Sequence, residues 1–208
     1  MASPRPLRKV KATLAVEVCA RFELREEART LLTPTATPRA FLETLLERRQ
    51  LPAAMSFLAH ALPQREAVWW GCLCLRHAYG PSPAPADAAA LKASAEWVLE
   101  PTEDRRMTAA SLATEMGVGT PAGSLATAVA WTGGSLGPPN PKVPEVPPGP
   151  DLPAKAVSGA VLLASAKAEP LRIEETQRTF VQLGIDVAEG LVTWPDVKPK
   201  PPRRTWGR

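Results

Sequence analysis

The stretch that most constrains the fold is AVWWGCLCL, residues 67–75, which carries no charge and holds two adjacent tryptophans. Pro63 precedes it and Gly80 follows it, and such residues commonly start and end an α-helix. A helix that is apolar on every side is normally buried among other helices. We therefore expect residues 63–80 to form the central helix of a core. Gly71 indicates a close approach by another helix, because glycine within a helix costs about 1 kcal/mol relative to alanine.

The rest of the chain up to residue 131 carries the pattern of short helices. Apolar residues recur at helical spacing, and the Thr-Pro pairs at 37–38 and 120–121 each supply an N-cap followed by proline at the first helical position. Asp87 is expected to cap the following helix, and Gly184 to end a helix that begins after Pro170. We expect an all-α fold, either an irregular multi-helix bundle or a short solenoid-like array, with seven or eight helices before residue 132.

The prolines of the next segment recur every third residue, at 138, 141, 144, 147, 150 and 153. A polyproline II helix has three residues per turn, so all six would share one edge of a rod roughly 46 Å long. The favoured interpretation is a strap that lies on the chain's own domain. A stiff spacer and a ligand for a partner's aromatic groove are the alternatives.

The basic residues gather at the two ends of the chain. Four of the 25 lie in the first 12 residues and five in the last 11, which leaves the middle with 16 basic and 21 acidic groups. Neither end carries a nucleic-acid-binding motif, so we expect solvated tails and no nucleic-acid partner. The expected organisation is a basic N-terminal tail (1–12), a main helical domain (13–137), a proline-rich strap (138–153), C-terminal helices that pack on the main domain (154–195) and a basic proline-rich tail (196–208).

Three cysteines are an odd number, and Cys72 and Cys74 are too close for an easy mutual disulfide. A reducing compartment fits this usage. Glu17 interrupts the first apolar run after five residues, which is too short for a secretion signal, and no run of about 18 apolar residues occurs. We expect a cytoplasmic protein without a membrane span, and its oligomeric state stays open.

The sequence offers few groups for catalysis or metal binding. A metal site would need Cys72, Cys74 and His77, with His60 or Cys19 as the fourth ligand, but side chains two positions apart on a helix point about 200° away from each other. Nucleophile-elbow, zinc-protease and phosphate-loop motifs do not occur. We expect no catalytic, metal or cofactor-binding residue. The alternative is an enzyme whose small substrate lies near His60, Glu66 and His77.

Four residues at the start of the tryptophan helix are candidates for contact with a partner protein: Arg65, Glu66, Trp69 and Trp70. Glu66 complements the helix dipole in the first turn. Arg65 would stack on Trp69 one turn later. The simpler interpretation is helix capping with an internal salt bridge. The other is a polar rim beside an aromatic anchor, which is the usual anatomy of an interaction hot spot.

Three stretches, FLAHALPQREAVWWGCLCLRHA, TPAGSLATAVAWTGGSLGPP and FVQLGIDVAEG, resemble an uncharacterised family of bacterial proteins of similar length. The resemblance runs from Phe41 to about Trp194. The family has no established chemistry, so no catalytic residue carries over. The resemblance implies genes near type VI secretion components, including PAAR-like spike-tip proteins and their accessory proteins. We therefore expect a non-enzymatic adaptor that binds another protein during assembly or effector loading of a secretion apparatus.

Overall fold

The computed structural model describes residues 5–137 and 144–194. Within these ranges the chain forms ten α-helices and no strand, which confirms the all-α fold class. The helices are α1 (Ala15–Cys19), α2 (Glu26–Arg29), α3 (Pro38–Glu47), α4 (Leu51–Ala61), α5 (Gln64–Tyr79), α6 (Pro85–Leu99), α7 (Glu103–Met116), α8 (Pro121–Ala130), α9 (Leu152–Ala166) and α10 (Ile173–Glu189), and a 3-10 turn, η1 (Pro170–Arg172), precedes α10.

Helix α5 lies at the centre of the molecule, as its apolar sequence predicts. It packs against α6, α8, α9 and α10, and Ala67 to Cys72 are all buried. The close approach expected at Gly71 is also confirmed, because a Cβ atom there would lie 2.6 Å from Cδ1 of Leu125 on α8. The indole Nε1 of Trp70 donates to the carbonyl of Phe180 at 2.8 Å and so joins α5 to α10.

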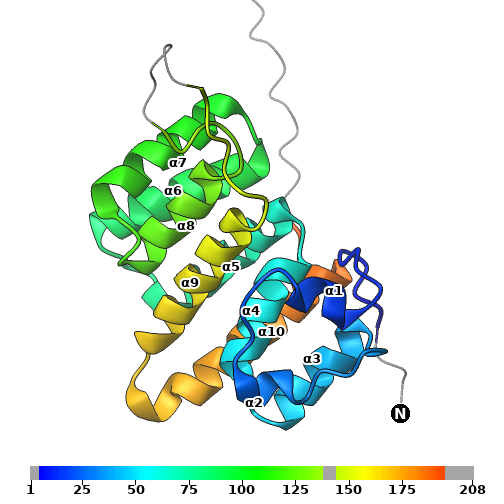
Figure 1. The fold of residues 1–208 in the computed structure, drawn as a ribbon. Helices are drawn as coiled ribbons and strands as arrows, with labels where there is room; N and C mark the ends of the chain where they lie inside the picture. Colours follow the sequence, from blue (N-terminus) through cyan, green and yellow to red (C-terminus); the bar gives the residue numbers. More distant parts are fainter. Residues whose placement is uncertain (1–4, 138–143, 195–208) are drawn as a thin grey trace, which may run out of the picture.

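The helices gather in two groups joined by α5 and α9. Helices α6, α7 and α8 pack on one another in the upper part of Figure 1, and α1 to α4 lie in the lower part. Helix α9 contacts both α8 and α4, and α10 packs on α4 and α5. Contacts between helices so distant in sequence do not occur in a solenoid, where each repeat touches only its neighbours. The fold is therefore the irregular bundle.

The two Thr-Pro pairs start helices as expected. The hydroxyl of Thr37 accepts from the amide of Ala40 at 3.2 Å, and that of Thr120 accepts from the amide of Gly123 at 3.0 Å. The prediction for Asp87 was wrong. Helix α6 begins two residues earlier at Pro85, whose missing N–H costs nothing in the first turn, and Asp87 instead accepts a hydrogen bond from the Tyr79 hydroxyl at 3.1 Å.

Gly184 does not end a helix, contrary to the prediction. Helix α10 runs through it to Glu189 and ends at Gly190, which has a left-handed φ of 78°. The reason for glycine at 184 is packing, because a Cβ atom there would lie 2.7 Å from Cδ1 of Leu58 and 3.0 Å from Nε1 of Trp70. A glycine that permits close packing and one that ends a helix look alike in the sequence.

The structure does not show the proline-rich strap over its predicted length of residues 138–153. Pro153 lies in the first turn of α9, so an extended rod does not continue to that residue. Val146 bonds back to the segment that follows α8. Its carbonyl accepts from the Leu136 amide at 2.8 Å, and its amide donates to the Ser135 hydroxyl at 3.0 Å. Residues 138–143, which include the first two prolines of the series, lie outside the described residues.

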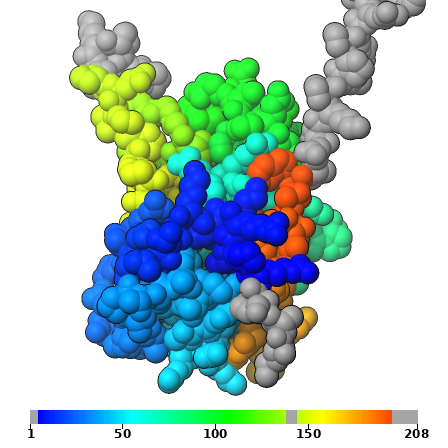
Figure 2. Space-filling view, turned by 90° about the vertical axis from the view of Figure 1, so that its right-hand side faces the viewer, coloured from blue at the N-terminus to red at the C-terminus, as the bar shows by residue number. Residues whose placement is uncertain are grey.

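The N-terminal segment, residues 5–12, is not a solvated tail. The amide of Lys9 donates to the carbonyl of Ala188 at 2.8 Å, and Leu7 and Val10 pack partly buried against the core. Figure 2 shows these residues, in dark blue, lying beside the orange-red end of α10. The segment stays in place because it buries apolar side chains. The tail expected at 196–208 lies outside the described residues, and no helix within them is long and apolar enough to cross a membrane.

Candidate binding groove

The tryptophans expected to contact a partner lie inside the protein. Trp70 has no exposed surface, and Trp69 is 8% exposed. A partner cannot reach Trp70 while the bundle is folded, so the prediction that this residue is a surface anchor is corrected. The physical reason is that α5 is enclosed by other helices on most of its sides.

Arg65 and Glu66 attach other segments to α5. The Arg65 guanidinium donates from Nε to the carbonyl of Val98 at 2.7 Å and from Nη2 to that of Leu99 at 3.0 Å. It stacks on Trp194, at 4.2 Å from the ring centroid, and not on Trp69 as expected. Glu66 pairs with Lys9 of the N-terminal segment, with 3.3 Å between Nζ and Oε1. Both side chains therefore have intramolecular partners.

The three residues of the enzyme alternative lie apart. His60 is buried in the last turn of α4, Glu66 lies beside Lys9, and His77 is exposed on α5 with its ring edge-on to Phe180, 5.8 Å between centroids. The two cavities that His60 lines include neither Glu66 nor His77.

The two cysteines of α5 are buried free thiols. Burial raises the pKa of Cys72 to about 12 and that of Cys74 well above the usual value for a thiol, because the apolar surroundings disfavour the thiolate. In the part of the chain that the structure describes, no three histidine, cysteine or acidic side chains lie close enough to hold a metal ion.

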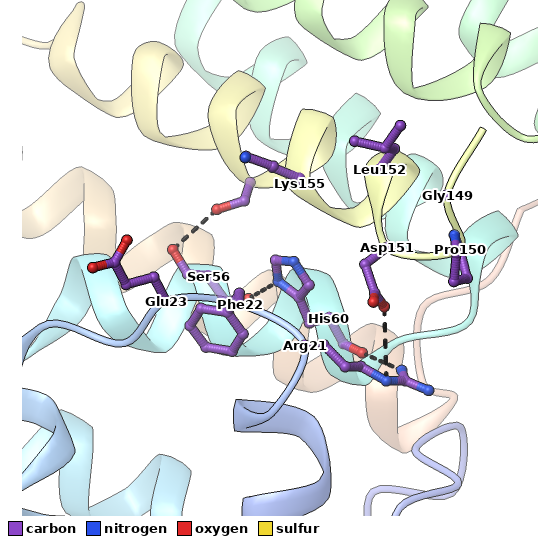
Figure 3. Close-up of a pocket in the computed structure, with 11 residues that line it drawn as sticks. Arg21, Phe22, Glu23, Ser56, His60, Gly149, Pro150, Asp151, Leu152 and Lys155 are labelled. Atoms are coloured by element: carbon purple, nitrogen blue, oxygen red, sulfur yellow. Dashed lines mark hydrogen bonds and ion pairs between the residues drawn. The ribbon is translucent and has the colours of Figure 1, made fainter. Parts of the chain in front are cut away.

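A cavity of about 600 Å³, which we call the main cavity, lies between α4, the start of α9 and the loop after α1 (Figure 3). Three more hollows of about 400, 190 and 330 Å³ adjoin it. The first shares Phe22 and Ser56 with the main cavity, the second shares His60 with it, and the third joins the second at Pro63. We call these four neighbouring hollows together the α4 groove; their lining runs from Gln50 at the start of α4 to Pro63 beyond its end.

His60 is the most enclosed polar side chain of the groove, at 3% exposure. Its ring stacks on Phe22, with 4.5 Å between centroids and 20° between planes. Nδ1 lies 2.8 Å from the carbonyl of Ser56 and donates to it in the neutral tautomer, which leaves Nε2 as an acceptor. Nε2 is closed to solvent and has no hydrogen-bond partner among the described residues. Burial lowers the pKa of His60, so the ring is neutral near pH 7.

The walls of the groove are joined by polar contacts. The hydroxyls of Ser56 on α4 and Ser158 on α9 lie 3.0 Å apart. Arg21 donates from Nη1 to the carbonyl of His60 at 3.0 Å, and its Nε lies 3.9 Å from Oδ1 of Asp151. Charged residues of both signs line the groove in equal number: Lys11, Arg21, Arg25 and Lys155 against Glu17, Glu23, Glu27 and Asp151.

Sequence reasoning singled out His60 for another role and missed Arg21, Phe22, Asp151 and Lys155. These residues come from segments more than a hundred positions apart, so no local pattern joins them. One signal was present in α4 itself. Ser56 and His60 are four residues apart in an otherwise apolar helix, and that spacing places two polar groups on one face.

Comparison with known proteins gives one match. A family model described as "Family of unknown function (DUF6931)" matches residues 41–188, well over half of the chain. The matched region includes α4 and α9 but not the loop that carries Phe22. No curated protein and no solved structure matches the chain.

Proposed function

The chain belongs to the DUF6931 family of unknown function, and we propose that it is a non-enzymatic accessory protein that binds an extended segment of another protein in the α4 groove. The observation that carries this proposal is the row of four hollows beside α4, each of which shares lining residues with a neighbouring one. Helix α4 has 11 residues and is therefore about 16 Å long. About five residues of extended chain, at roughly 3.3 Å each, span that length.

The chemistry of the lining suits a peptide. Phe22, Leu152 and Leu162 offer apolar surface for side chains, whereas Ser56 and Gln50 offer groups that hydrogen-bond to a main chain. Extended peptides are commonly bound in this way, with main-chain hydrogen bonds for affinity and pockets for alternate side chains.

The balance of charge in the groove indicates the charge of the occupant. Because four basic and four acidic residues line it, neither a strongly acidic nor a strongly basic segment gains from the groove as a whole. We expect a segment with little net charge, and therefore an affinity that changes little with salt. A nucleic acid would show the opposite behaviour, because its binding weakens steeply as salt rises.

The enzyme alternative has no support from the arrangement, since His60, Glu66 and His77 lie apart. Two further parts of the proposal, the compartment and the identity of the partner, rest on the sequence. We place the protein in the cytoplasm because its three cysteines are free thiols. We name a type VI secretion component or its cargo as the partner because of the resemblance to proteins encoded near such systems.

The proposal is tested by selecting ligands from a phage-displayed library of random linear peptides and measuring their Kd by calorimetry. Ala53 is half-buried in the groove, and Ala53→Trp fills part of it. We expect this variant to bind a selected peptide about tenfold more weakly or worse. The matched control is Thr108→Trp on the exposed side of α7, which is expected to bind normally. Equal affinity in both variants, or no selected peptide, would contradict the proposal.

A further inference from the structure

We propose that His60 is a protonation-sensitive latch that holds the side chain of Phe22, part of one wall of the α4 groove, against α4, and that acidification releases this side chain. The effect on ligand binding rests on the proposed function, whereas the latch itself can be measured in the free protein.

The wall is attached to α4 through His60. The Phe22 ring stacks on the imidazole, and the Arg21 guanidinium donates to the His60 carbonyl at 3.0 Å. Leu24, at 4% exposure, anchors the next part of the loop in the core. Release of the ring contact would therefore free the Phe22 side chain, whereas Arg21 keeps its hydrogen bond to the main-chain carbonyl of His60 and Leu24 stays in the core.

A second proton on the imidazole has no suitable acceptor in the closed arrangement. Nδ1 already donates to the Ser56 carbonyl, and Nε2 is closed to solvent without a partner among the described residues. In Figure 3 the ring lies between Phe22 and the first turn of α9. A buried charge without a partner is costly, so the charged ring is stabilised by turning toward water. That movement breaks the stack on Phe22.

The charged groups that face the ring do not remove this cost. Asp151 at the start of α9 favours the imidazolium, but Arg21 from the loop and Lys155 from α9 oppose it. Glu23 lines the same cavity and is the only other acidic residue there. Burial is the largest influence and lowers the pKa of His60.

The sign of the pH dependence follows from the lowered pKa of His60. Below the ordinary histidine pKa of about 6.5 the unfolded chain takes up a proton that the closed native state does not. The stabilisation by neutral His60 is therefore complete above about pH 6.5 and is lost as the pH falls from there through the folded pKa. Protonation should release the Phe22 side chain in the same window.

The test compares the full chain with His60→Phe and His60→Gln, neither of which titrates, and with His77→Phe as the matched control. His77 is the only other histidine and lies outside the cavity. Between about pH 7.5 and about pH 5.5 we expect the unfolding equilibrium constant of wild type and His77→Phe to rise about fivefold more than that of the His60 variants. NMR signals of the Phe22 ring should lose their ring-current shift over the same range in wild type and His77→Phe.

Identical pH profiles in wild type and both His60 variants, or a Phe22 ring that stays stacked once the His60 imidazole has taken up its second proton, would overturn the latch. Calorimetry with a selected peptide separates it from the proposed function. A peptide that binds the groove with the same pH dependence in wild type and His60→Gln refutes the latch alone. A latch that opens in a protein that binds no peptide refutes the proposed function alone.

Discussion

At the scale of single residues, the room for a Cβ atom decides whether a helix position accepts a residue other than glycine. Gly71 and Gly184 both lie inside helices where a neighbouring side chain occupies the place of a Cβ atom. At Gly71 the neighbour is the end of Leu125, which is flexible. At Gly184 it includes the Trp70 indole, which is held rigidly by its hydrogen bond to Phe180. The second site should therefore be the less tolerant one.

We predict that Gly184→Ala lowers the free energy of unfolding by up to about 2 kcal/mol. Overpacking costs about 1 to 3 kcal/mol, and alanine's better helix propensity offsets only about 1 kcal/mol of it. Urea unfolding measures the change. The control is Gly159→Ala in α9, where a Cβ atom meets nothing within 4 Å and a small stabilisation is expected. A stabilised Gly184→Ala protein would show that the contact with Trp70 relaxes freely.

At the scale of elements, helix ends and short segments are joined by long polar side chains. Arg65 bonds to the last carbonyls of α6, which a helix leaves without partners, and its positive charge complements the negative end of that helix. The same guanidinium stacks on Trp194. One side chain therefore joins α5, α6 and the segment after α10.

We predict that Arg65→Ala lowers the free energy of unfolding by about 1 to 3 kcal/mol, because it leaves two helix carbonyls without their charged donor. Arg65→Lys should restore little, since an ammonium cannot bond to both carbonyls and stack at the same time. Urea unfolding and the Trp194 environment, followed by fluorescence, report the loss. Arg76→Ala, an exposed position on the same helix, is the control.

The same variant separates the two interpretations of this residue. If Arg65 is structural, a folded Arg65→Ala protein binds a groove peptide as wild type does. A folded variant that has lost its partner would instead support the interaction hot spot expected from the sequence.

At the scale of the whole molecule, the N-terminal segment joins elements that are far apart in the chain. Lys9 bonds to Ala188 at the end of α10 and pairs with Glu66 on α5, while Arg39 on α3 pairs with Glu189 and donates to the carbonyl of Arg5. Leu7 and Val10 add apolar contact. The segment thus completes the side of the bundle where α3, α5 and α10 meet.

We predict that removal of residues 1–12 lowers the free energy of unfolding by about 2 to 3 kcal/mol. Most of this comes from the partly buried Leu7 and Val10, and the rest from one main-chain hydrogen bond. The Lys9 to Glu66 pair adds little, because Lys9 is 37% exposed. Thermal unfolding compares this truncation with one that removes only residues 1–4 and keeps these contacts. Equal melting temperatures would refute the prediction.

The sequence by itself determined the helices and the identity of the central one. Thr37 and Thr120 cap the helices they precede through local hydrogen bonds, and the apolar run around Trp70 permits no position other than the interior. These features depend on residues only a few positions apart, because hydrophobic periodicity and helix capping are local signals.

Only the tertiary structure decided the groove, the partner of Arg65 and the role of Gly184. Phe22, His60 and Asp151 meet because α4, α9 and the loop after α1 pack together. Arg65 could stack on Trp69 or on Trp194, and the sequence favours the nearer ring although the structure uses the distant one. The reason is physical: local signals report what a segment can form, whereas the neighbours that enclose a side chain are chosen when the whole core packs.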